Sequence, residues 1–289
     1  MSTVRMGISP VIATVILTGI MLTIISVAIY YSTSLIDLNR QTMEYQNAKD
    51  LLTYAATVLE QVAFGTGGSR YVRFSLTSTG VNFENQSMFL RIQIAPLGGM
   101  GGSSPPISIP LERISIRGGP LVTTVARLLY PETGSLDTEL SKLVVGAGEP
   151  LVIVYENFSG ASFSYLEPRR ARIVYNGAFN VTENSMGVDC DGDGQVTTLL
   201  KCKVNYFMIQ VVQLVPGQVG GSGTIPVVFR NVGGEVYNYT FNSANVQVTA
   251  SLVDVNNRVL SSQTFKTSAP PANFCVVVVK ISKIQVSTG

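Results

Sequence analysis

The densest group of potential metal ligands in the sequence is one short loop, Asp189-Cys190-Asp191-Gly192-Asp193-Gly194-Gln195. Its carboxylates alternate along the chain before a glycine, the spacing that wraps a hard cation such as calcium. We expect Asp189, Asp191 and Asp193 to bind a structural Ca²⁺. The Gln195 carbonyl would be a further oxygen ligand. The twelfth position of an EF-hand needs a bidentate acid but is Leu200 here. A solvated acidic turn is the alternative, because Asp and Gly also favour turns.

The cysteines and the missing histidines limit the remaining chemistry. Cys190 lies in the acidic loop and Cys202 on the strand predicted after it, so a disulfide between them would brace the loop in an oxidising exterior. Cys275, in an apolar strand, is expected to be inert packing. The absence of histidine excludes Ser-His-Asp and Cys-His triads and His-ligated zinc. The few acids form no outstanding pair for a glycosidase, so no enzymatic activity is expected.

Four segments match the acceptor pattern for N-linked glycosylation. They begin at Asn85, Asn157, Asn180 and Asn238. Glycans at these positions would fit a surface protein and would help to solubilise a domain that is poor in charge.

These candidate sites need an element that carries them to the cell exterior, and the N-terminus supplies it. The 289 residues are 46% hydrophobic and only 13% charged, about half the roughly 25% charged residues of ordinary soluble proteins. The net charge of +2 gives no reason to expect a nucleic-acid partner. No charge occurs from Ile8 to Ile36, more than the roughly 20 residues that span a bilayer as a helix.

The uncharged segment has two other interpretations, a buried core helix and a cleavable secretory signal. Core helices rarely run this far without a charge, and a secretory signal has an apolar region of only about 7–15 residues. Ser9 and Pro10 suit a helix start. Arg5, before the segment, favours a cytoplasmic N-terminus and an external remainder.

Apolar residues then recur at helical spacing beyond the uncharged segment. This stripe predicts one helix over residues 8–64, roughly 80 Å long, whose outer half must pack on a head domain or on neighbouring helices. Glycines at 65, 67 and 68 end it. The stripe consists of Ala48, Leu51, Leu52, Ala55, Val58, Leu59, Val62 and Ala63.

After the glycines the pattern changes to the alternation of half-buried strands. Turn signals at intervals of about 8–15 residues and no second long helix predict an all-β sandwich. Residues 69–215 and 216–289 are either two sandwich lobes or one sandwich with a continuation. Asn256-Asn257 is a predicted hairpin turn. The candidate strands are Tyr71–Leu76, Met88–Ile94, Ile107–Ile114, Leu121–Leu129, Leu151–Tyr155, Arg172–Tyr175, Leu199–Val212, Ile225–Arg230, Val246–Val253, Val259–Thr264 and Phe274–Val286.

The N-terminal residues Gly-Ile-Ser-Pro-Val-Ile-Ala-Thr-Val-Ile-Leu-Thr, after a short basic leader, resemble the archaeal type IV pilin-like proteins. The resemblance covers about residues 4–36. It implies that a prepilin-type peptidase cuts between Gly7 and Ile8 and removes the leader, residues 1–7. Two departures stand out: Met6 separates the basic residue from the cut, and the position of the bacterial pilin glutamate is Ile12 here.

The resemblance implies a structural subunit of a pilus-like filament, made by pilus assembly machinery from a membrane-anchored precursor. The helices of many copies would form the filament core by self-association, and the glycosylated head would face the exterior for adhesion or cell contact. A monomeric, membrane-anchored binding protein is the alternative, since it would share the anchor and the β head.

Overall fold

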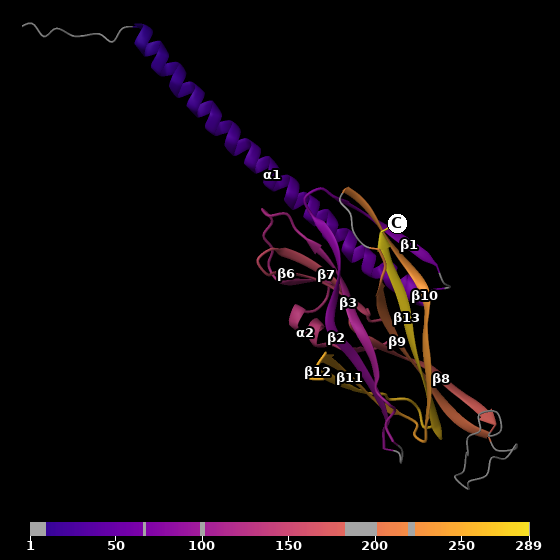
Figure 1. The fold of residues 1–289 in the computed structure, drawn as a ribbon. Helices are drawn as coiled ribbons and strands as arrows, with labels where there is room; N and C mark the ends of the chain where they lie inside the picture. Colours follow the sequence, from indigo (N-terminus) through magenta and orange to yellow (C-terminus); the bar gives the residue numbers. More distant parts are fainter. Residues whose placement is uncertain (1–9, 66–67, 99–101, 183–200, 219–222, 289) are drawn as a thin grey trace, which may run out of the picture.

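The computed structural model describes residues 10–65, 68–98, 102–182, 201–218 and 223–288. In these ranges a long N-terminal helix leads into a mainly β head (Figure 1). The helices are α1 (Pro10–Phe64) and α2 (Leu136–Ser141). The strands are β1 (Ser69–Leu76), β2 (Gly80–Pro96), β3 (Ile107–Arg117), β4 (Arg127–Tyr130), β5 (Val144–Val145), β6 (Val152–Phe158), β7 (Ser162–Pro168), β8 (Ala171–Thr182), β9 (Lys201–Pro216), β10 (Gly223–Phe241), β11 (Val246–Asp254), β12 (Val259–Lys266) and β13 (Phe274–Thr288).

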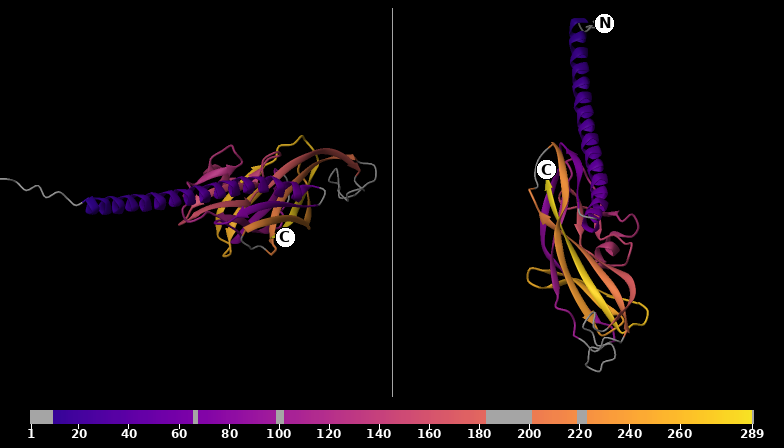
Figure 2. Two further views of the ribbon diagram at one scale, coloured as in Figure 1. Left: turned by 90° about the horizontal axis from the view of Figure 1, so that it is seen from above. Right: turned by 90° about the vertical axis from the view of Figure 1, so that its right-hand side faces the viewer.

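Helix α1 runs without interruption for 55 residues, about 82 Å at 1.5 Å per residue, which confirms the predicted long helix. It ends at Gly65, whose N–H donates to the Gln61 carbonyl over 2.9 Å. A Cβ atom at position 65 would lie 2.4 Å from that carbonyl oxygen, so only glycine fits this close approach. Figure 2 shows the first half of α1 projecting from the head and the second half lying along it.

The head consists of two sheets. One has the strand order β1-β10-β13-β9-β8-β5, and the other has the order β12-β11-β2-β3-β7-β6-β4. Most neighbours are antiparallel, but β9 and β13 are parallel, as are β5 and β8. Strands from residues 69–215 and 216–289 share both sheets, because β1 pairs with β10 and β2 with β11. The boundary at residue 216 therefore does not separate two sets of sheets.

The two sheets pack directly on each other in the part of the head away from the projecting helix. There Ile92 of β2, Val248 of β11, Ile209 of β9 and Val277 of β13 belong to one buried cluster. Nearer the projecting helix, the second half of α1 fills the space between the sheets, and Leu52 and Leu59 are fully buried. The predicted apolar stripe is buried there, except that Leu51 is only half-buried. The head therefore folds around its own helix.

Most of the predicted strands are present, and two differences have local causes. The strand predicted over Leu121–Leu129 is wrong for most of its length, since only β4 at its end is a strand. The Leu121 N–H donates to the Gln41 side chain and the Val122 N–H to the Gly119 carbonyl, so this segment forms a turn against α1. Strand β7 was not predicted because it buries polar residues, including Ser164, which bonds to Tyr45 of α1.

Candidate assembly interface

The first half of α1 presents an apolar surface that nothing in the described chain covers. Every large hydrophobic side chain from Val11 to Ile36 is more than half exposed. Within the described ranges this helix alone is long and apolar enough to cross a membrane. Fully burying one such side chain is worth about 1.5–3 kcal/mol, so this segment requires an apolar environment.

The polar side chains of the exposed half are compatible with such an environment. The Thr14 hydroxyl donates to the Val11 carbonyl over 2.9 Å, and Thr23 and Ser26 donate to the carbonyls four residues before them. A hydroxyl that is bonded within its own helix costs little when water is removed. The segment can therefore be buried in lipid or against other helices on all of its faces.

The second half of α1 is held in the head by buried charge. Lys49 donates to Glu156 of β6 over 3.1 Å, and the two side chains are only 7% and 3% exposed. The Lys49 ammonium also lies 5.2 Å from the centre of the Tyr45 ring. Arg127 makes a second ion pair with Glu156. Since unpaired charges are costly in a protein interior, this contact specifies how far the helix is inserted.

Two glutamates of α1 secure the helix on either side of Lys49. The Glu60 carboxylate accepts from the Leu151 N–H over 2.6 Å and pairs with Arg172 over 2.5 Å. Near the point where the helix leaves the head, the Glu44 carboxylate accepts from the backbone N–H groups of the β1–β2 turn, residues 77–79. Burial alone would raise the pKa of Glu44, but these hydrogen bonds outweigh it and lower the pKa.

The last turn of α1 is also bonded to the strands. The Ser282 hydroxyl of β13 donates to the Ala63 carbonyl over 2.8 Å, and the Asn231 amide of β10 donates to the Val62 carbonyl over 3.1 Å. Carbonyls at a helix C-terminus lack partners within the helix, so these bonds stabilise its end. The projecting half is thus the continuation of a helix that the head holds at several points along its second half.

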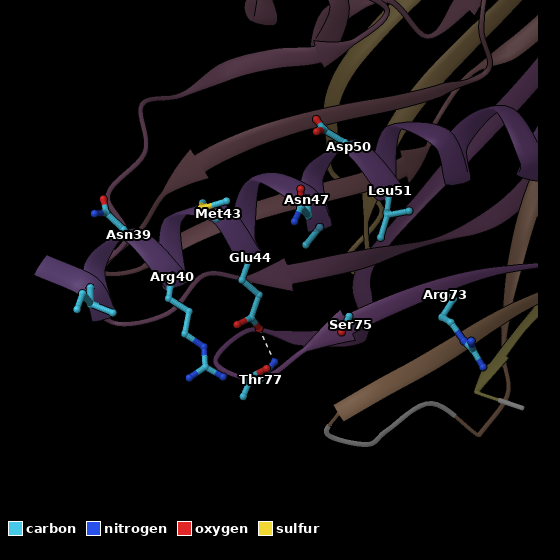
Figure 3. Close-up of a pocket in the computed structure, with 12 residues that line it drawn as sticks. Asn39, Arg40, Met43, Glu44, Asn47, Asp50, Leu51, Arg73, Ser75 and Thr77 are labelled. Atoms are coloured by element: carbon cyan, nitrogen blue, oxygen red, sulfur yellow. Dashed lines mark hydrogen bonds between the residues drawn. The ribbon is translucent and has the colours of Figure 1, made fainter. Parts of the chain in front are cut away.

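A groove runs between α1 and β1 where the helix leaves the head (Figure 3). We call it the neck groove. Its volume is about 850 Å³. It begins at Ile36, the last residue of the uncharged segment, and continues past Met43 and Leu51. Strand β1 forms its other wall and is the edge strand of its sheet. The lining residues are Ile36, Asn39, Arg40, Met43, Glu44, Asn47, Ala48, Asp50, Leu51, Arg73, Ser75 and Thr77.

The four predicted glycosylation sites are all exposed, as modification requires. Asn85 lies where the β2–β3 register shifts, and Asn157 lies at the end of β6. Asn180 and Asn238 lie within β8 and β10 rather than at turns.

The predicted calcium ligands Asp189, Asp191, Asp193 and Gln195 lie outside the described residues, as do Gly7 and Ile8. Cys202 is disulfide-bonded and buried. Its predicted partner Cys190 also lies outside the described residues, so the pairing stays a prediction. Cys275 is a free, buried thiol, and burial raises its pKa to about 12, which agrees with a packing role. Among the described residues no group of three or more acidic, cysteine or histidine side chains could hold a metal.

Sequence reasoning did not identify the contacts that hold α1. One signal was available, because Lys49 lies three residues before Leu52 of the predicted apolar stripe and is thus a charge at the edge of the face predicted to be buried. Its partner Glu156 had no such signal, since it is one of several acids among strand residues.

The chain was also compared with known proteins. No family model, curated protein or solved structure matches it.

Proposed function

We propose that this protein is a structural subunit of a pilus-like surface filament. The first half of α1 anchors the precursor in the cell membrane and then packs with the same helix of other copies in the filament core. The head faces the exterior and carries glycans at Asn85, Asn157, Asn180 and Asn238. It would serve adhesion or cell contact.

One observation carries this proposal: a single unbroken helix has one half buried in the head and one half exposed. The contacts of Glu44, Lys49 and Glu60 keep the second half in place, so the exposed half cannot fold back onto the head. An apolar rod outside the head can be buried only by lipid or by other chains. Identical rods in non-closing, heterologous contact produce an open helical filament.

The resemblance of the N-terminus to archaeal type IV pilin-like proteins supports the same proposal. It places the cut of a prepilin-type peptidase between Gly7 and Ile8, so that the mature subunit begins at the apolar helix. Pilus assembly machinery would then transfer the helix from the membrane to the filament.

The test is electron microscopy of the cell surface with an antibody against the head, together with N-terminal sequencing of the labelled material. We expect labelled filaments whose subunit begins at Ile8. Cells that lack the protein are the control. A protein that stays a detergent-soluble monomer with an intact Met1 or Ser2 start, and no labelled filaments, would favour the membrane-anchored binding protein instead.

A further inference from the structure

The neck groove carries charges that the chain leaves unpaired. Among the described residues, the guanidinium groups of Arg40 and Arg73 have no hydrogen-bond or ion-pair partner. Glu44 lies between them but is engaged by the β1–β2 turn. In Figure 3 the side chains of Arg40 and Glu44 extend from the helix on the side of Thr77, and Arg73 extends from β1 itself. This side of the groove is therefore positively charged and suited to an acidic partner.

The rim of the groove away from β1 presents an acid, Asp50. It is exposed, and within the described ranges its carboxylate accepts one bond, from the Gln46 amide over 3.1 Å. Figure 3 shows its side chain pointing away from Arg40 and Glu44. The neck thus has an acidic rim at Asp50 of α1 and a basic rim at Arg40 of α1 and Arg73 of β1, and the acidic rim of one copy complements the basic rim of another.

The positions of the charges along the helix set the offset between two such copies. Arg70 contacts Gln61, and the Thr77 N–H contacts Glu44, so β1 runs antiparallel to α1 beside it. The strand covers about 23 Å between these contacts and the helix about 26 Å, so their axes are nearly parallel. Interpolation between these contacts places Arg73 level with about residue 54 of α1. This level is about 6 Å from Asp50 along the helix axis, toward the C-terminal end of α1.

We infer that the neck groove receives a second copy of this chain, whose Asp50 pairs with Arg73 across the contact. This inference rests on the proposed function, because a common membrane makes the helices of two copies parallel. The groove is also continuous with the exposed half of α1 through Ile36, so one neighbouring helix can cover both. The second copy is displaced by about 6 Å along the axis, and the contact joins two different surfaces. When each copy repeats this contact with the next, the copies do not close into a ring and instead extend into a filament.

Charge reversal tests the inference in the full-length protein. We expect Asp50→Arg and Arg73→Asp each to reduce the yield of sedimented surface filaments at least tenfold. The double variant restores the pair with opposite polarity and should recover most of the yield. Arg258→Asp is the matched control, because Arg258 is an exposed arginine in the β11–β12 turn, and it should leave the yield unchanged.

A cross-linking experiment keeps the inference falsifiable if a charge variant accumulates poorly. Chains carrying Asp50→Cys and chains carrying Arg73→Cys are produced together and treated with a bismaleimide cross-linker, because an arginine–carboxylate pair holds the two backbones farther apart than a disulfide can span. A cross-linked dimer that contains one chain of each kind is the expected product. Normal filament yield from both single charge variants, or no recovery in a well-expressed double variant, overturns the inference, as does the absence of the mixed dimer from assembled filaments. In each of these cases wild-type filaments still form, whereas their absence would overturn the proposed function itself.

Discussion

Removal of the Lys49 charge is the most direct test of how the head holds the helix. Lys49→Met keeps most of the apolar stem and deletes the ammonium group that pairs with Glu156. Glu156 then remains buried, and Arg127 is its one remaining cationic partner in the part of the chain that the structure describes. The Arg127 side chain is 58% exposed, so it compensates the buried carboxylate only in part.

The size of the effect follows from the burial of the pair. Removing one partner of a buried ion pair costs about 3–5 kcal/mol of unfolding free energy. Because Arg127 still compensates part of the Glu156 charge, we expect Lys49→Met to cost about 3 kcal/mol, the lower end of this range. That corresponds to a fall of about 6–12 °C in Tm at 2–4 °C per kcal/mol. Glu156→Leu leaves the Lys49 ammonium buried without an acid and should cost as much or more. In the double variant neither buried charge remains, so its cost should be well under half of the sum of the single costs.

Thermal and urea unfolding of the full-length protein in detergent, followed by circular dichroism, provides these values. Lys266→Met is the matched control, because Lys266 is exposed on β12, and its unfolding free energy should change by no more than about 0.5 kcal/mol. Additive single effects in the double variant, or a loss below about 1 kcal/mol for Lys49→Met, would refute the conclusion that this pair holds the helix in the head.

Three further predictions concern the exposed helix, the neck and the acidic loop. Val15→Asp should abolish filaments while Val15→Leu should not, since an unpaired charge in lipid or a helix core costs several kcal/mol; normal filaments from Val15→Asp, at equal protein levels by immunoblot, would contradict the helix-core proposal. Glu44→Gln should lower Tm at neutral pH, and the difference from wild type should shrink as the pH falls through the lowered pKa of Glu44, because a depressed carboxylate pKa stabilises the fold only while the group is ionised. Calcium should raise Tm relative to a chelator, and Asp191→Asn should remove that difference; equal Tm values in wild type, with three free thiols by mass analysis, would leave only an acidic turn at Asp189–Asp193.

Local sequence patterns were sufficient to predict the helices and strands in which apolar residues recur at a regular spacing. The uncharged segment and the apolar stripe predicted α1 up to its end at Phe64, because a helix repeats its faces every 3.6 residues whatever surrounds it. Alternation likewise predicted strands such as β3, β11 and β13, and the hairpin turn at Asn256-Asn257 is present, with Asn257 at φ 62°. In β11, for example, fully buried and half-buried residues alternate over most of the strand, so the pattern can be read without knowledge of the partner.

Tertiary structure alone decided where the helix and the strands meet. Lys49 and Glu156 are 107 residues apart, and neither residue type predicts the other, because a buried ion pair depends on which strand happens to face the helix. Strand β7 escaped prediction for the same reason, since its buried Ser164 bonds to Tyr45 of α1, a partner that the local sequence does not indicate. The neck groove exists because β1 runs antiparallel along α1, which places Arg73 beside the second half of the helix and Thr77 beside Glu44. Periodicity reports which side of an element is buried, whereas the identity of the burying element depends on long-range chain topology.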